Sequence, residues 1–216
     1  MIQIKLSVLI PSFNEEKTIR EVITKVLEQD CIHEIIVIDD HSSDNTSNIV
    51  KSIENPKIKY LKNEMNKGKG YSLKRGIEIA SGNYILIQDA DLEYSPSEYP
   101  RLLAPIKDSF ADAVFGSRFL TYDARRVLYF WHSQGNKFLT LLSNFFSNLD
   151  LTDMETCYKV LPSDFAKSIT IKESRFGIEP ELVAKLAKQK LRIYEVPISY
   201  HGRTYDEGKK ITTRVS

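Results

Sequence analysis

The chain has 216 residues, a length that suits one large α/β domain. Its 30 lysines and arginines are balanced by 29 aspartates and glutamates, and the formal net charge of +1 excludes a bulk electrostatic attraction to nucleic acid. Two cysteines, Cys31 and Cys157, fit neither a disulfide framework nor a zinc site, and a reducing compartment suits them. Because no signal-peptide pattern and no apolar run of membrane-spanning length is seen, we expect a cytoplasmic protein, either free or peripheral on the cytoplasmic face of a membrane.

In the first half of the chain, short apolar runs alternate with segments of helical periodicity. Expected strands cover residues 6–10, 35–38, 58–61, 85–88 and 111–115. Expected helices cover residues 15–29, a segment that starts near 43–46, and residues 70–80. Strands that alternate with helices predict an α/β fold with a mostly parallel central sheet and helices on both faces.

The second half is more aromatic and ends in a polar segment. Residues 127–131 and 138–146 are strongly apolar, and they form either a core helix or an amphipathic surface that meets lipid. Residues 191–198 are expected to form a strand, and residues 201–216 a polar, flexible tail. We therefore expect one domain over residues 1–216, with two halves at 1–118 and 119–216.

Two acidic pairs follow expected strands. Asp89 and Asp91 flank Ala90 directly after the apolar run at 84–88, with no cationic neighbour in the sequence. Asp39 and Asp40 follow the run at 35–38 in the same way. Neighbouring carboxylates repel each other unless a cation lies between them, and Mg²⁺ binds through one or two carboxylates together with substrate phosphates. In open α/β sheets ligands bind at this end of the strands, so either a metal-bound diphosphate or a solvated acidic turn accounts for each pair.

Other segments carry weaker signals. Residues 66–70, Asn-Lys-Gly-Lys-Gly, have neither of the glycine-loop spacings that are typical of nucleotide-binding proteins. Arg118 follows an expected strand, where it is either a phosphate clamp or a surface side chain. Asp153, Glu155 and Glu179 are candidate bases or substrate ligands, and each is equally explained as a helix cap or an ion-pair partner.

Taken together, the motifs resemble the inverting family 2 glycosyltransferases of the GT-A fold, and among them the polyprenyl-phosphate sugar synthases that transfer mannose or glucose to dolichyl or polyprenyl phosphate. The likeness covers nearly the whole chain, and eight segments carry it in order: Pro-Ser-Phe-Asn-Glu at 11–15, Ile-Asp-Asp-His-Ser-Ser-Asp-Asn-Thr at 38–46, Asn-Lys-Gly-Lys-Gly at 66–70, Asp-Ala-Asp-Leu-Glu at 89–93, Gly-Ser-Arg at 116–118, Thr-Asp-Met-Glu-Thr at 152–156, Glu-Val-Pro-Ile-Ser-Tyr at 195–200 and Arg-Thr-Tyr-Asp-Glu-Gly-Lys at 203–209.

The resemblance implies a role for each matching position. The nucleotide-sugar donor would be bound by Pro11, Phe13, Glu15, Ile38, Asp40, Asp89, Ala90, Arg118 and Lys209. Mg²⁺ or Mn²⁺ would be held by Asp89, Asp91 and Glu93. The catalytic set would be Asp153, Asp91 and Arg203, with Asp153 on the acceptor side. Residues 1–118 would then form the nucleotide-sugar-binding half, and residues 119–216 the acceptor half with its flexible tail.

The implied function is transfer of a hexose, with inversion and metal assistance, from a donor of the GDP-mannose or UDP-glucose type to polyprenyl or dolichyl phosphate at a membrane surface. Partners would be the nucleotide-sugar donor, the lipid-phosphate acceptor, and a membrane protein or a second copy of the chain, but no nucleic acid. Three alternatives stay open at this point: transfer to a soluble or glycan hydroxyl, a sugar nucleotidyltransferase, and a non-catalytic degenerate transferase.

Overall fold

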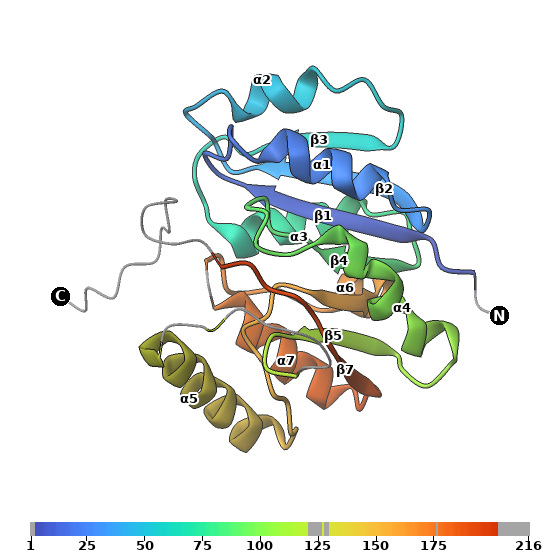
Figure 1. The fold of residues 1–216 in the computed structure, drawn as a ribbon, viewed down its shortest axis with the longest axis vertical. Helices are drawn as coiled ribbons and strands as arrows, with labels where there is room; N and C mark the ends of the chain where they lie inside the picture. The colour runs from blue at the N-terminus through green and yellow to red at the C-terminus, as the bar shows by residue number, and fades with distance from the viewer. Residues whose placement is uncertain (1–2, 121–126, 128–129, 176, 203–216) are drawn as a thin grey trace.

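The fold is built on one twisted sheet of seven strands (Figure 1). The computed structural model describes residues 3–120, 127, 130–175 and 177–202. The strands are β1 (Leu6–Ser12), β2 (Ile32–Asp39), β3 (Ile58–Lys62), β4 (Tyr84–Ile87), β5 (Ala113–Ser117), β6 (Lys159–Pro162) and β7 (Ile193–Pro197). Their order in the sheet is β3-β2-β1-β4-β6-β5-β7. Every pairing is parallel except the two made by β6, which runs antiparallel between β4 and β5.

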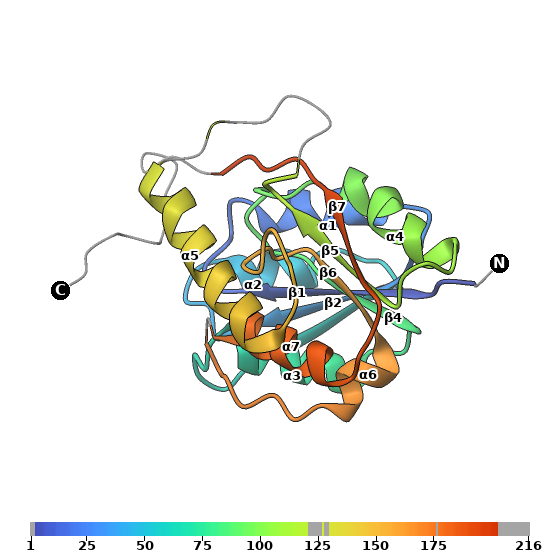
Figure 2. The same cartoon turned by 90° about the horizontal axis from the view of Figure 1, so that it is seen from below.

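Helices cover both faces of this sheet, as the alternation of strands and helices predicted. The helices are α1 (Ile19–Leu27), α2 (Thr46–Lys51), α3 (Lys69–Ile79), the 3₁₀ turn η1 (Pro96–Glu98), α4 (Tyr99–Lys107), α5 (Phe130–Ser147), α6 (Ser163–Ser168) and α7 (Ile178–Lys188). Viewed along the sheet, α1 and α4 lie on one face, and α3, α6 and α7 on the other (Figure 2). The sequence expectations did not include α4, α6, α7 or β6.

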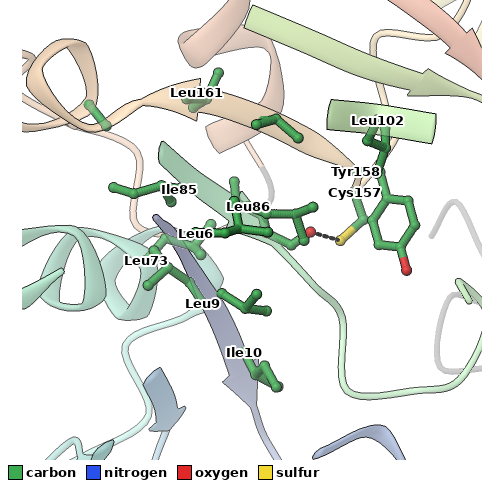
Figure 3. Close-up of a cluster of buried hydrophobic side chains, with 14 of the residues drawn as sticks. Leu6, Leu9, Ile10, Leu73, Ile85, Leu86, Leu102, Cys157, Tyr158 and Leu161 are labelled. Carbon is green, nitrogen blue, oxygen red and sulfur yellow. Dashed lines mark hydrogen bonds between the residues drawn. The ribbon is translucent and has the colours of Figure 1, made fainter. Parts of the chain in front are cut away.

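The core lies between the sheet and these helices, and most of the apolar strand residues are fully buried. Figure 3 shows part of it, where Leu6, Leu9 and Ile85 of β1 and β4 meet Leu73 of α3. Cys157 is buried at the edge of this cluster, and its thiol donates to the carbonyl oxygen of Ile87 at 3.5 Å. Both cysteines are free thiols.

Strand β1 continues through Pro11, where the sequence predicted its end. The carbonyl oxygen of Leu9 accepts the N–H of Gln88 on the β4 side, whereas that of Ser12 accepts the N–H of Asp40 on the β2 side. Alternate residues of a strand face the same neighbour, so Pro11 faces the β4 side, as Leu9 does. The pairing of β1 with β4 has already ended at Leu9, and the missing N–H of Pro11 therefore costs no sheet hydrogen bond.

Helix α5 lies at the outside of the molecule, packs against α7, and turns its polar side inward (Figures 1 and 2). Thr140 is its one buried residue, and Thr140 and Asn144 hydrogen bond to the segment 151–154. The apolar side chains are exposed instead: Phe130, Trp131, Phe138, Leu139, Leu141, Leu142, Phe145 and Phe146. We call these eight residues the α5 apolar face. Of the two sequence readings for this stretch, a core helix is therefore excluded for residues 130–147.

In the described ranges no helix combines the length and the apolarity needed to cross a membrane.

Candidate active site

A cleft of about 300 Å³ opens at the carboxyl ends of β1, β2 and β4, next to the first turn of α3. This is the edge at which open α/β sheets bind their ligands. The residues that line it are Pro11, Ser12, Phe13, Asp40, Asn66, Gly68, Lys69, Ser72, Asp89 and Arg175. The two acidic pairs that the sequence placed at strand ends thus each contribute one carboxylate to the same cleft.

Asp40 shapes the wall of the cleft through the segment before α3. One carboxylate oxygen accepts the backbone N–H of Lys67 at 2.9 Å and the Asn63 amide at 2.7 Å, and the other accepts the N–H of Gly68 at 2.7 Å. Gly68 has φ 96°, in the left-handed region that glycine adopts without strain. Asp40 therefore fixes the backbone of residues 67–68, directly before the first turn of α3, in addition to any contact it makes with a ligand.

Asp39, its neighbour, is a structural residue. It is fully buried and accepts the Tyr60 hydroxyl at 2.8 Å and the N–H of Ser42 at 2.8 Å.

Asp89 has a cationic partner in space that the sequence around it does not reveal. Lys69, the first residue of α3, places its ammonium 2.9 Å from Asp89 Oδ1 and 3.0 Å from Glu179 Oε1. Burial lowers the pKa of Lys69, but the charges of Asp89 and Glu179 outweigh it and hold the pKa well above its usual range. Lys69 is therefore a permanent cation inside the cleft, and its charge is fully matched by carboxylates of the protein.

The carboxylates near the end of β4 suit a hard divalent cation only in part. Asp89 lines the cleft, and Asp91 follows two residues later, with one oxygen accepting the N–H of Glu93 at 3.1 Å. Glu93 Oε2 accepts the Tyr200 hydroxyl at 2.7 Å. Over the described ranges, no three or more His, Cys, Asp or Glu side chains are gathered closely enough to hold a metal ion. Two carboxylates fit Mg²⁺ or Mn²⁺ if the remaining ligands come from phosphate and water.

A buried ion pair forms a second centre beside the first. The Arg118 guanidinium donates to both oxygens of Asp153, at 2.7 Å each, and the Arg118 backbone N–H adds a third bond at 2.9 Å. Asp153 is fully buried. The Arg118 guanidinium lies 5.2 Å from the centre of the Tyr200 ring, and the Tyr200 hydroxyl donates to Glu93. Tyr200 therefore connects the Arg118–Asp153 pair to the carboxylates that follow β4.

A buried lysine holds the segment that carries Asp153. The Lys159 ammonium, on β6, donates to the carbonyl oxygens of Met154 and Thr156. Burial lowers the pKa of Lys159. Glu155, between these two acceptors, is half-buried, and burial followed by the nearby charge of Glu179 raises its pKa. A carboxyl group with a raised pKa at such a position is a candidate proton acceptor.

The structure separates the sequence-predicted residues into groups. Pro11, Phe13, Asp40 and Asp89 line the cleft, whereas Ile38 and Ala90 are buried and do not, and Glu15 accepts the Thr18 hydroxyl at 3.1 Å outside its lining.

Arg203 and Lys209 lie outside the described residues. Six further lining residues were not among the predicted site residues: Ser12, Asn66, Gly68, Lys69, Ser72 and Arg175. Four of the six lie inside the segments 11–15 and 66–70 that carry the resemblance, but nothing in the sequence around Ser72 or Arg175 marks these two residues.

Comparison with known proteins gives matches over most of the chain. The model of a family described as "Glycosyl transferase family 2" matches residues 7–169. The dolichol-phosphate mannosyltransferase of Pyrococcus furiosus is 26% identical over 95% of this chain and 59% of its own length. The UDP-N-acetylglucosamine--dolichyl-phosphate N-acetylglucosaminyltransferase of Methanococcus voltae is 27% identical over 88% of this chain and 83% of its own length.

Among solved structures, glucosyl-3-phosphoglycerate synthase from Mycobacterium tuberculosis, in complex with Mn²⁺, UDP and phosphoglyceric acid, superposes with a TM-score of 0.74. It is 19% identical, and the match covers 94% of this chain and 73% of that one. The same enzyme with Mg²⁺ and UDP gives a TM-score of 0.73. At this identity the likeness shows the fold.

Proposed function

The chain belongs to glycosyl transferase family 2 and is a glycosyltransferase with the GT-A fold; from this premise we propose that it transfers a hexose from a nucleoside-diphosphate sugar to a polyprenyl or dolichyl phosphate, with inversion and with Mg²⁺ or Mn²⁺. The observation that carries the donor part is the cleft, where an exposed aromatic ring, Phe13, and two carboxylates, Asp40 and Asp89, share one space at the carboxyl ends of three strands.

In the proposed donor site, Phe13 stacks on the base and Asp40 holds the backbone of residues 67–68 in place. Asp89 and Asp91 would hold the divalent cation, which supplies positive charge to the departing diphosphate. Lys69 keeps Asp89 oriented by an ion pair from the first turn of α3. Nucleoside-diphosphate binding by a structural neighbour crystallised with UDP and Mn²⁺ supports this arrangement.

The acceptor part is supported by the Arg118–Asp153 pair and by the relatives named for dolichyl-phosphate and dolichol-phosphate chemistry. A phosphate acceptor is already ionised and needs no base. Both oxygens of Asp153 are occupied by Arg118, which suits a residue that positions a cation better than one that removes a proton. We propose that Arg118, held in this way, orients the acceptor phosphate.

We also propose that the α5 apolar face rests on the membrane that holds the acceptor. Trp131, Phe145 and Phe146 are each more than three-quarters exposed, and the helix carries one charged residue, the cation Lys137. Aromatic side chains with basic neighbours are typical of segments that lie in the interface of anionic lipid. The polar side of the same helix is hydrogen bonded to the segment 151–154, so α5 is attached directly to the segment that carries Asp153.

A second candidate, transfer to a hydroxyl acceptor, is favoured by Glu155. Its raised pKa and half-buried position beside Asp153 suit a general base. The two candidates differ in their dependence on lipid phosphate. The test is the release of UDP or GDP from a panel of nucleotide sugars with Mn²⁺, with and without polyprenyl phosphate and with soluble sugars. Release that depends on polyprenyl phosphate and disappears with chelator or in Asp91→Ala supports the first candidate. Release only with a soluble hydroxyl acceptor, lost in Glu155→Gln, supports the second.

Membrane docking has its own test, co-sedimentation with vesicles of phosphatidylcholine and phosphatidylglycerol. We expect the wild-type protein to sediment and a Trp131→Ser/Phe145→Ser variant to stay in the supernatant. Phe110 and Met65 are exposed to more than half their surface on other parts of the molecule, so Phe110→Ser/Met65→Ser is the matched control and should sediment like the wild type. Equal sedimentation of both variants would contradict the docking proposal.

A further inference from the structure

The segment between α6 and α7 reaches back to the donor cleft. Its Arg175 lines the cleft together with Lys69 and Asp89, more than 80 residues away in the chain. The segment belongs to the half of the chain that we expected to serve the acceptor. The lining of the donor cleft therefore includes a residue from beyond position 118.

Close backbone contacts fix this segment against the start of α3. The N–H of Tyr71 donates to the carbonyl oxygen of Ser174 at 3.1 Å. A Cβ on Gly70 would lie 2.1 Å from the carbonyl oxygen of Glu173, and a Cβ on Gly68 would lie 2.8 Å from Arg175 Cγ. The two glycines thus allow an approach that no other residue type permits, and the stem of Arg175 packs directly on Gly68.

The other side of the segment is tied to the first turn of α7. Glu181 accepts the backbone N–H groups of Lys172 and Glu173 at distances of 2.8–3.1 Å. Held on both sides, the segment presents Arg175 to the cleft from a defined position.

The charges of the cleft single out Arg175. Lys69 is matched by Asp89 and Glu179, and the nearby Arg118 by Asp153. Among the described residues, no hydrogen bond or ion pair engages the Arg175 side chain, so none of these residues balances its charge. An arginine at the wall of a cleft, with its guanidinium unpaired among the described residues, is suited to bind a phosphate group in bidentate fashion.

We propose that Arg175 binds the diphosphate of the donor and of the nucleoside-diphosphate product, and that the contact between Gly68, Gly70 and the segment 172–175 serves to place it there. The inference rests on the proposed function. It adds a cation from the second half of the chain to a donor site otherwise built from the first half. The diphosphate gains negative charge as the sugar leaves, so the contact strengthens during the reaction.

The experiment measures binding by calorimetry, with Mn²⁺ present, of whichever of UDP and GDP the wild-type protein binds. Arg175→Ala should weaken that affinity about 10- to 100-fold, the range of a hydrogen bond to a charged group, while the affinity for the matching nucleoside, measured by competition, stays within about twofold. Arg175→Lys should recover part of the loss, because it restores the charge without the bidentate geometry.

Lys172→Ala is the matched control, since it removes one positive charge from the same segment without touching the cleft, and it should bind like the wild type. Equal denaturation midpoints of the variants exclude a folding defect. An unchanged diphosphate affinity in Arg175→Ala overturns the proposal, and so does an equal loss for diphosphate and nucleoside, which would mean that Arg175 shapes the base pocket. A wild-type protein that binds neither UDP nor GDP would overturn the proposed function itself.

Discussion

Replacing Asp153 by asparagine removes one charge from a buried pair and leaves the other in place. Asp153 is fully buried and the Arg118 side chain is 9% exposed. Asparagine keeps the shape but turns one acceptor into a donor, so an N–H would face the guanidinium across one of the two 2.7 Å contacts. Removal of one partner from a buried ion pair costs about 3–5 kcal/mol, because an uncompensated charge stays behind. We therefore expect Asp153→Asn to lower the free energy of unfolding by about that amount.

The assay is urea denaturation followed by circular dichroism, because the single tryptophan, Trp131, lies on the exposed face of α5 and does not report on the core. The double variant Arg118→Met/Asp153→Leu removes both charges and should recover most of the stability, while it stays inactive. If Asp153→Asn abolished turnover at a cost below about 1 kcal/mol, the positioning argument would be refuted and Asp153 would instead act in proton transfer.

Three further predictions concern parts of the fold that support the site. Burial raises the pKa of Glu34, but hydrogen bonds, first from Lys59, outweigh it and lower the pKa to about 2 from 4.5. The ionised Glu34 therefore stabilises the fold above pH 4.5, and up to about 3 kcal/mol of the free energy of unfolding should be lost as the pH falls toward 2. Thermal melts at several pH values should show this loss in the wild type and not in Glu34→Gln. Gly70→Ala should destabilise by about 1–3 kcal/mol in urea, because its Cβ meets backbone, whereas Gly135→Ala, with nothing within 4 Å, should stabilise α5 by about 0.5–1 kcal/mol. Lys159→Met leaves the buried carbonyl oxygens of Met154 and Thr156 without the ammonium that donates to them. We expect kcat to fall while the KM for the nucleotide sugar stays near the wild-type value. A weaker affinity for the nucleotide sugar alone would contradict a role of Lys159 in holding the segment that carries Asp153.

The sequence was sufficient to predict the regular part of the fold. The apolar runs at 35–38, 58–61 and 85–88 lie within or beside β2, β3 and β4, and the alternation of elements predicted the mostly parallel sheet. Strand ends were less predictable where a charged residue is buried. Strand β2 begins at Ile32 rather than 35, because Glu34 is satisfied inside by Ser7, Ser81 and Lys59.

Strand β6 was missed for a similar reason. Its first residue, Lys159, suggests a surface position but is buried among carbonyl oxygens of the preceding turn. No local pattern distinguishes such a lysine from an exposed one.

The candidate site was predicted where its residues follow strands and was missed where they depend on tertiary contact. Phe13, Asp40 and Asp89 each follow a strand closely, and all three line the cleft. Arg175 reaches it only because Gly68 and Gly70 admit a distant segment, and the pairing of Lys69 with Asp89 spans 20 residues. The roles of all the predicted site residues stay predictions, those of Asp91, Glu93, Arg203 and Lys209 included.

The inverted orientation of α5 separates what keeps the protein folded from what it meets outside. Its polar side is satisfied by the domain, so the eight apolar side chains contribute little to folding and their replacement by polar residues should leave the fold intact. Substitutions at these positions are therefore not limited by the stability of the fold. The α5 apolar face can change to suit a different membrane or partner without disturbing the Arg118–Asp153 pair. At the same time, the hydrogen bonds of Thr140 and Asn144 fix the position of the segment 151–154 relative to α5. On a bilayer, α5 would act as a spacer that holds Arg118 at a constant level relative to the headgroups.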